Sequence, residues 1–575
     1  MRLPLQEDPI LWSKVNTQHQ RKGSNFILKL FFLLAFTPRI GKADVLPFPA
    51  ESCQSNWSNE SPTAYLYEFG KDSDYPSYVK RMQEAGRDRK NCHKTWTVLI
   101  YMSATQDLIP YAYADLLEME AAHSSLLIDG APVGENPLKQ MATTGSSLRS
   151  DVIVQLATDS LTTISRFHMF ETSQDQVSNL KKEDLSKLVR QNIHSPEIMQ
   201  FNRPMPATES QLFEDFLRWG IEEYPSEHYV VIIWGHGQGW TAIESSHQAQ
   251  NKPAASFFLK GRYGGLALDG NADYLDIPSL RKALKNIEDA TGDPIAVFAS
   301  DACLMQSVED VTELADCAQY ICGSEDIESY AGFPYGSLLC QLNSGIFDGA
   351  SSRAHSEELS QSEPYLVSWM IPQLYKDSFD PNKGSQKNLD PIAYHDLTGC
   401  AISAKHLRTS LVPALNRLGA SLINFIEEES LRWIDIKELI HEGPFFQGGT
   451  QDLGAFLQKL SNLLNLDIQN HNNGATKAAA HLRQAIWVTH SSLNYTVVNA
   501  VLGDNYPVID PKQIGPRGIS IWLPESDDVF FNRFEDFSNS RFWSTSEKTF
   551  PGWKTWLMRM YPKGFAKAIA RAHQL

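Results

Sequence analysis

The sequence predicts an α/β fold in which a mostly parallel central sheet carries helices on both faces, followed by a mixed α/β C-terminal region. Short apolar runs occur without polar alternation, which is typical of parallel strands buried on both faces. Segments with helical periodicity separate these runs, and this alternation implies right-handed crossovers. The 575 residues are too many for one ordinary core, so we expect two or three domains.

The expected elements follow in a regular order. Strand-like apolar runs lie at 96–102, 151–157, 229–234, 294–300 and 319–323. Helical patterns separate them at 111–123, 210–224, 277–289 and 304–316. Further helices are predicted at 404–418 and 453–464, and further strands at 485–488 and 518–523. A polar stretch after residue 345 marks a boundary, so 94–345 and 346–575 are predicted as separate domains.

The N-terminal part of the chain predicts export. An apolar stretch at 26–36 follows two basic residues and precedes the small residue Ala43. This stretch is too short to span a bilayer, whereas the pattern is typical of a secretory signal; an ordinary buried segment is the alternative. We expect a signal peptide at 1–43, an extension or propeptide at 44–93, and a secreted or periplasmic protein without a stable membrane span.

Charge and cysteine usage narrow the functional classes. The formal net charge of −17 leaves no basic surplus to neutralise phosphates, so nucleic-acid binding is not expected. The seven cysteines show no CxxC or zinc-type spacing. Cys53 and Cys92 are the first pair we would expect to form a disulfide in an exported protein, although spacing alone does not fix the pairing.

Two strand-like runs end at residues that can perform covalent chemistry. The run 294–300 leads into Cys303, and the run 229–234 leads into His236, which stands between two glycines. Parallel strands would bring both side chains to one crevice, where open α/β sheets bind ligands. A helix beginning after Cys303 would favour its thiolate. The pair predicts covalent acyl transfer, with a buried structural thiol and a turn histidine as the alternatives.

These residues resemble the clostripain family of cysteine peptidases, which shares the caspase–hemoglobinase fold. The resemblance runs from about residue 95 to residue 560 in the family's order. The segments that carry it are 96–102, Asp107-Leu108, Asp115-Leu116, Trp234-Gly235-His236-Gly237-Gln238-Gly239-Trp240, Leu268-Asp269, Asp301-Ala302-Cys303-Leu304-Met305, Gly323-Ser324-Glu325, Gly332-Phe333-Pro334-Tyr335 and 517–524. The resemblance implies a caspase-like catalytic domain at 94–345, with Cys303 as the nucleophile and His236 as the general acid/base.

The same resemblance implies roles for the surrounding residues. The backbone N–H groups of Gly237 and Cys303 would bind the oxyanion. Asp301 would line the pocket for the residue before the scissile bond, where a carboxylate can pair bidentately with guanidinium. Ser324 and Glu325 would be further substrate-binding residues. The resemblance requires no third, orienting carboxylate.

One position departs from the family pattern. Family members carry an acidic residue where this chain has Ala331, so one negative charge is missing and a strict preference for arginine is an open question. Glu328 and Asp326 are the candidates to replace that charge. Asp301 also has an alternative role, because an aspartate placed before a helix can cap its N-terminus.

The loop 241–265 separates the histidine from the cysteine and is expected to be exposed. Related peptidases cleave themselves between these two residues, so Lys260 and Arg262 are candidate self-cleavage sites; an ordinary surface loop is the alternative. The resemblance also implies calcium dependence in some members. The segment 269–273 is not an EF-hand, because the glycine and glutamate that such a loop needs are missing. We predict no metal ligands and no required cofactor.

The sequence therefore predicts a cysteine endopeptidase that cleaves protein or peptide substrates after Arg or Lys through an acyl-enzyme at Cys303. We expect a monomer or a self-cleaved two-chain form. Two alternatives stay open at this point. One is an inactive caspase-like module that binds proteins or peptides, and the other is a related acyl-transfer enzyme such as a transpeptidase.

Overall fold

The computed structural model describes residues 94–572, apart from gaps of which the longest are 122–143, 241–264 and 348–361. The signal peptide predicted at 1–43, the extension predicted at 44–93 and the cysteines Cys53 and Cys92 lie outside the described residues. In the part of the chain that the structure describes, no helix combines the length and the apolar character needed to cross a membrane.

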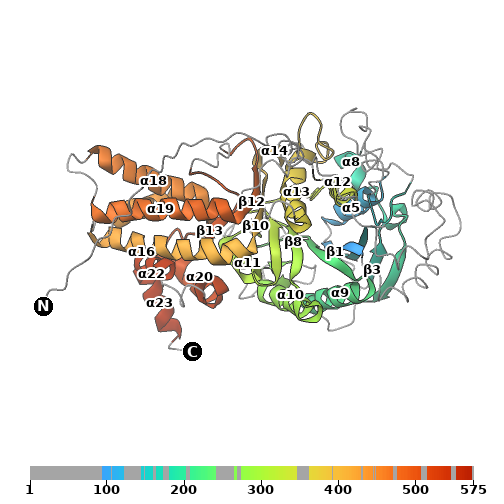
Figure 1. Ribbon diagram of the computed structural model, residues 1–575, viewed down its shortest axis with the longest axis horizontal. Helices are drawn as coiled ribbons and strands as arrows, with labels where there is room; N and C mark the ends of the chain where they lie inside the picture. The colour runs from blue at the N-terminus through green and yellow to red at the C-terminus, as the bar shows by residue number, and fades with distance from the viewer. Residues whose placement is uncertain are drawn as a thin grey trace, which may run out of the picture. The chain divides into compact units, whose positions relative to one another are not determined.

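A nine-stranded mixed sheet forms the centre of the fold (Figure 1). Its strand order is β12-β10-β9-β8-β5-β1-β2-β3-β4. The strands are β1 (Lys94–Ala104), β2 (Ser150–Thr158), β3 (Thr163–His168), β4 (Glu197–Asn202), β5 (Ser226–Trp234), β8 (Ile295–Asp301), β9 (Ala318–Gly323), β10 (Thr398–Ser403) and β12 (Val497–Leu502). The five strands from β9 to β2 are parallel, and the outer strands continue the sheet in antiparallel fashion. The predicted α/β fold with a mostly parallel centre is confirmed.

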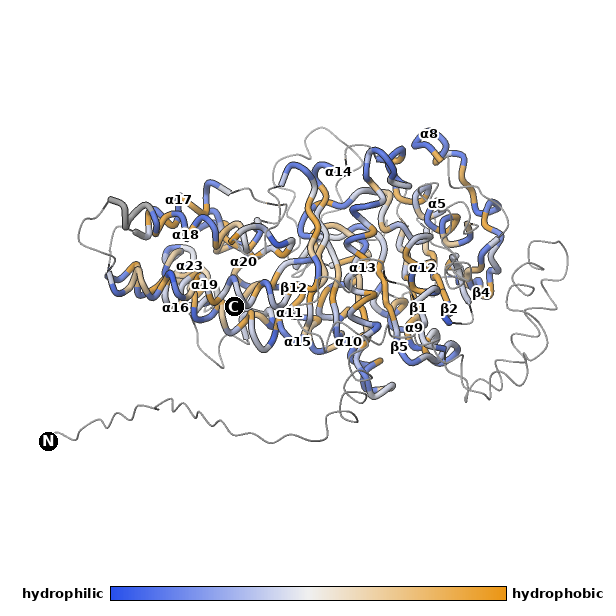
Figure 2. The backbone as a smooth tube through the Cα atoms, turned by 45° about the horizontal axis from the view of Figure 1, so that its top comes forward, coloured by the Kyte–Doolittle hydropathy of each residue, from blue (hydrophilic) through white to orange (hydrophobic). Residues whose placement is uncertain are grey.

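Hydrophobic cores cover both faces of this sheet. In β1, Leu99 and Tyr101 belong to one core, whereas Val98 and Ile100 belong to the other, as the alternation of side chains along a strand requires. In Figure 2 the hydrophobic residues, drawn in orange, are concentrated in the central strands. The first core takes in α9 (Glu209–Glu223), α10 (Ile277–Thr291) and α11 (Val308–Leu314). The second takes in α5 (Ile109–Glu120), α12 (Tyr335–Ser344) and α13 (Glu363–Ser378).

Local sequence signals explain where the helices beside the parallel strands begin and end. The Thr208 hydroxyl accepts a hydrogen bond from the Gln211 N–H, and the Gln211 side-chain oxygen accepts one from the Thr208 N–H, which is a capping box at the start of α9. Asp276 caps α10 in the same way through the Ser279 N–H. Gly292 ends α10 with φ +87°, a conformation that glycine adopts at little cost.

The C-terminal region continues the sheet through β10 and β12 and also extends the first core. Its main helices are α16 (Val412–Glu428), α18 (Leu453–Asn470), α19 (Lys477–Thr496) and α22 (Gly552–Met560). Helices α16 and α22 cross so closely that a Cβ on Gly419 would lie 2.4 Å from the backbone of Gly552. The catalytic strands and the C-terminal helices therefore share one continuous core.

Two of the predicted elements are wrong. The strand predicted at 485–488 lies inside α19, where Leu482, Ala485, Ile486 and Thr489 are buried, a spacing that follows helical and not strand periodicity. The helix predicted at 304–316 begins only at Val308, because Leu304 has φ +66°. Ser307 caps this helix by accepting a hydrogen bond of 3.1 Å from the Asp310 N–H.

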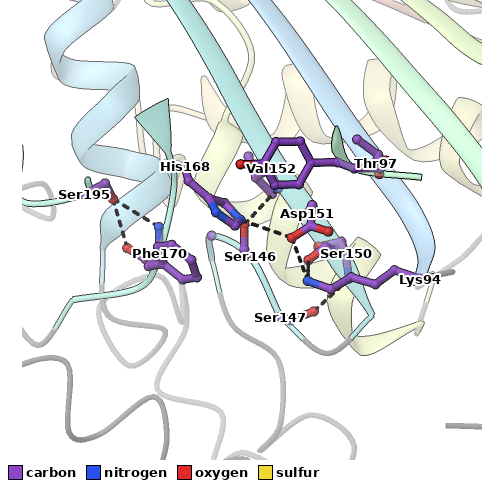
Figure 3. Close-up of polar contacts among 12 residues, drawn as sticks. Lys94, Thr97, Ser146, Ser147, Ser150, Asp151, Val152, His168, Phe170 and Ser195 are labelled. Carbon is purple, nitrogen blue, oxygen red and sulfur yellow. Dashed lines mark hydrogen bonds and ion pairs between the residues drawn. The ribbon is translucent and has the colours of Figure 1, made fainter. Parts of the chain in front are cut away.

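A polar cluster ties the amino ends of β1 and β2 together (Figure 3). The Asp151 carboxylate accepts from the Lys94 ammonium at 2.7 Å and lies 3.1 Å from Nε2 of His168. Ser146 is labelled beside them, but its hydroxyl accepts from the Val152 N–H. Lys94 and Asp151 lie at the amino ends of the parallel strands β1 and β2, and His168 lies at the carboxyl end of the antiparallel strand β3. All three therefore stand at the edge of the sheet opposite Cys303, and we assign the cluster to holding the fold.

Candidate active site

Strands β5 and β8 deliver the histidine and cysteine loops to the same edge of the sheet. The two strands are parallel neighbours, and Trp234 stands opposite Asp301 in their register. The first residue after β5 continues the pairing, since the Gly235 N–H donates to the Asp301 carbonyl at 3.2 Å. His236 and Cys303 follow directly, so the predicted convergence of the two loops is what the structure shows.

Gly237 marks the point of closest approach between these loops. A Cβ at this position would lie 2.3 Å from the Cys303 carbonyl oxygen and 3.1 Å from the Cys303 nitrogen. Only glycine can occupy such a position without moving the neighbouring backbone. The backbone of Gly237 therefore lies directly against Cys303, as an oxyanion site built from their two N–H groups would need.

Cys303 is partly exposed as a residue, while the other described cysteines, Cys317, Cys322, Cys340 and Cys400, are buried; none of these five forms a disulfide. Its sulfur accepts a hydrogen bond from the Glu328 N–H at 3.2 Å. Burial and then the negative charge of Glu328 raise the pKa of Cys303 to about 12, so the resting group is a thiol. The predicted help from a helix N-terminus is wrong, because α11 begins only at Val308.

His236 has an acidic neighbour that the sequence analysis did not predict. Its Nε2 lies 3.3 Å from Oδ2 of Asp107, a residue in the connection between β1 and α5. The Tyr330 ring stands 6.4 Å from the imidazole in an edge-on arrangement. A carboxylate in this position can orient the ring and stabilise the imidazolium that forms when His236 accepts a proton. The only signal in the sequence was the place of Asp107 just after the first strand-like run.

Asp301 lies buried beneath the cysteine loop with an exposed fraction of 4%. Its Oδ2 accepts hydrogen bonds from the Phe333 N–H at 3.0 Å and the Tyr335 hydroxyl at 2.8 Å. Burial raises the pKa of Asp301 to about 7. Gly332 makes room for it, since a Cβ there would lie 2.8 Å from Oδ2. The alternative role of Asp301 as the cap of the following helix is wrong, because Ser307 performs it.

The structure buries Ser324 and Glu325, the other two residues expected to bind substrate. The Ser324 hydroxyl is 2.7 Å from that of Thr398 on β10, and it also accepts from the Asp326 N–H. Glu325 is 1% exposed, and the neighbouring Asp452 of the C-terminal region contributes to raising its pKa after burial itself. Both side chains therefore brace the loop after β9 from within the protein.

Several predicted features lie outside the described residues. The candidate self-cleavage sites Lys260 and Arg262 fall in the gap 241–264, and the segment 269–273 falls in another gap. Across the residues that the structure describes, no group of three or more His, Cys, Asp or Glu side chains is arranged to hold a metal ion.

Comparison with known proteins places the chain in a family. A model of the Clostripain family (Peptidase C11) matches residues 100–550. A search of curated proteins found no significant match. Among solved structures, a secreted C11 cysteine protease from Bacteroides thetaiotaomicron is 15% identical with a TM-score of 0.44, and the match covers 79% of this chain and 99% of that chain. An inactive zymogen C11 protease from Parabacteroides distasonis is 14% identical with a TM-score of 0.41, covering 79% and 98%. Because the family model spans most of its length, the chain belongs to the clostripain family and is a cysteine peptidase, a hydrolase.

Proposed function

We propose that the protein is a cysteine endopeptidase that uses Cys303 and His236 and cleaves after Arg or Lys. The observation that carries this proposal is the position of a partly exposed cysteine and a histidine just after two adjoining strands, one of which ends at the buried carboxyl group of Asp301. Such an arrangement suits nucleophilic attack on a peptide carbonyl whose preceding side chain is cationic.

The raised pKa of Cys303 shapes the mechanism. Since the resting group is a thiol, His236 removes its proton as the sulfur attacks the carbonyl carbon. The N–H groups of Gly237 and Cys303 donate hydrogen bonds to the carbonyl oxygen as negative charge develops on it. In a serine protease, each such donor stabilises the transition state by about 2.7–4 kcal/mol. The imidazolium, with Asp107 beside it, then protonates the leaving amine, and water hydrolyses the acyl-enzyme.

Hydrolysis of matched fluorogenic peptides ending in Arg, Lys, Asp, Asn or Leu tests the proposal, with and without calcium. We expect cleavage after Arg or Lys that falls about 10³-fold or more in Cys303→Ala and in His236→Ala. Cleavage only after another residue would keep the mechanism and refute the specificity. Absence of cleavage, together with no selective labelling of Cys303 by a thiol-reactive probe, would favour an inactive peptide-binding module.

Self-processing belongs to the same proposal. Its support is the polar loop 241–265, whose Lys260 and Arg262 match the expected specificity. The wild-type enzyme should become two chains that stay associated, while Cys303→Ala should stay one chain. Cutting of both proteins at the same bond would show that another protease is responsible.

Export is the last part of the proposal, and its support is the sequence of residues 1–43. We expect the exported protein to begin after Ala43. N-terminal sequencing of secreted material tests this expectation, and a mature chain that still begins at Met1 would refute it.

A further inference from the structure

We infer that Glu328 is the second carboxylate of the substrate pocket and that it binds the cationic side chain of the substrate directly. The inference rests on the proposed function, because it concerns the pocket of the same site. Glu328 stands three positions before Ala331 in the same loop. The resemblance to the clostripain family implies a second acidic residue at the position of Ala331. The chain would therefore supply the missing charge from another position of the same loop.

The position of Glu328 beside the nucleophile supports this inference. Its backbone N–H donates to the Cys303 sulfur at 3.2 Å, so the residue borders the point where the substrate carbonyl is attacked. Cys303 is partly exposed, so solvent reaches the loop at this point. Asp326, the other candidate for the missing charge, accepts instead from the Tyr506 hydroxyl at 3.2 Å, on the side of the C-terminal region.

The carboxylate oxygens of Glu328 are available to accept hydrogen bonds from a bound cation. The residue is 7% exposed, and neither of its oxygens meets a described hydrogen-bond donor at full bonding geometry. The backbone N–H of Ala302 lies close enough to lower its pKa, but it serves only part of the carboxylate. A buried carboxylate with so few partners is unfavourable until a cation or further donor reaches it. Oδ2 of Asp301, by contrast, already accepts two hydrogen bonds. Glu328 thus has two oxygens available for the paired hydrogen bonds of a guanidinium.

The groups around Glu328 are acidic or phenolic, so they do not neutralise the negative charge of its carboxylate. Asp301 faces it from β8, Cys303 from the following loop, and Tyr335 and Tyr375 from α12 and α13. Burial and then Asp301 raise the pKa of Glu328 well above its ordinary value, and the nearby Ala302 N–H only partly opposes them. A substrate cation would supply the counter-charge that these neighbours do not.

Substitution of Glu328 by Gln tests the inference, because it removes the charge and keeps the shape. The substrates are a peptide with arginine before the scissile bond and its twin with citrulline, a neutral isostere of arginine. In the full-length enzyme we expect Glu328→Gln to lower the arginine-to-citrulline ratio of kcat/KM at least tenfold. The ratio is the readout because any change in the reactivity of Cys303 affects both peptides alike. Glu309→Gln, which alters a buried carboxyl on α11, is the matched control and should leave the ratio unchanged.

Protection of Cys303 from iodoacetamide by agmatine, a small guanidinium compound, gives a second measurement that needs no hydrolysis. We expect protection to need at least tenfold more agmatine in Glu328→Gln, and Glu328→Ala is the variant to use if the Gln protein does not fold. The inference would be overturned if Glu328→Gln kept the wild-type ratio and the wild-type protection curve while Asp301→Asn lost both the preference for arginine and the protection by agmatine. That outcome would leave the proposed function intact. A wild-type enzyme that cleaves neither peptide would instead refute the proposed function, and the inference with it.

Discussion

His236 and Asp107 show how a single contact can extend a catalytic pair. The histidine must accept a proton from a thiol whose pKa is raised to about 12, so every group that stabilises the imidazolium lowers the barrier. Asp107 lies 3.3 Å from Nε2, and its side chain is 54% exposed. Solvent screening at that exposure makes its effect smaller than that of a buried triad aspartate.

We therefore expect Asp107→Asn to lower kcat about tenfold and to leave KM nearly unchanged, because the substitution removes charge from the histidine and not from the substrate pocket. Steady-state kinetics on an arginine peptide measure both constants. Asp293→Asn, at an exposed position before β8, is the control and should behave like wild type. An unchanged kcat in Asp107→Asn would reduce the site to Cys303 and His236.

The pKa of Asp301 predicts how the preference for arginine depends on pH. Below about pH 7 its carboxyl is protonated and neutral, and above that value it is charged and attracts a cation. The arginine-to-citrulline ratio of kcat/KM should therefore rise as pH increases from 5.5 to 8.5. The ratio cancels any effect of pH on the catalytic step, because that step is the same for both peptides. A ratio that is flat over this range would contradict the assignment of Asp301 to the pocket.

At the scale of elements, the sequence was informative where a strand is buried on both faces. The predicted runs at 229–234 and 294–300 correspond to β5 and β8, and their ends bring the loops of His236 and Cys303 to one edge of the sheet. Antiparallel strands such as β3 and β4 were missed, because they are shorter or carry polar residues. The contacts of Asp107 and Glu328 depend on how separate loops fold against each other, which no local pattern in the sequence records.

The approach of the two catalytic loops gives a prediction for Gly237. A methyl group there would collide with the Cys303 backbone, so Gly237→Ala should displace the oxyanion donors and lower kcat/KM about 10²-fold or more. Gly292→Ala is the matched control, because no atom lies within 4 Å of its Cβ position. That control should keep full activity and lose about 1 kcal/mol of unfolding free energy through its positive φ, measured by urea denaturation. Full activity in Gly237→Ala would refute the predicted geometry of the oxyanion site.

Across the whole molecule, the site is one part of a larger set of buried acidic groups. Carboxyl groups with raised pKa values lie on the catalytic loops, on the helices beside them and in the C-terminal region: Asp115, Glu118, Asp301, Glu309, Asp310, Glu325, Glu328 and Asp452. Desolvation is the largest cause of each shift. Burial therefore has two effects: it makes a carboxyl group in the substrate pocket favourable for binding a cation, and it disfavours ionisation of these carboxyl groups in the folded protein near neutral pH.

This opposition predicts that stability falls as pH rises. A carboxyl group whose pKa is raised in the folded state binds its proton more tightly there than in the unfolded chain, so its contribution is present at low pH and is lost as pH rises toward the folded value. For Glu118 and Glu309 that window runs from about 4.5 to about 7. The unfolding free energy from urea denaturation should thus be higher at pH 5.5 than at pH 8 by at least about 2 kcal/mol.

The control is Glu309→Gln, whose side chain does not titrate in this range. Its unfolding free energy should change less with pH than that of the wild type. A slope of the opposite sign would refute this account. The Arg541–Asp316 ion pair, at 2.5 Å, cannot produce such a slope, because it holds the pKa of Asp316 well below its usual range and this group stays ionised from pH 5.5 to 8. Activity on arginine peptides and stability are therefore expected to change in opposite directions with pH, because both depend on carboxyl groups that the fold keeps away from water.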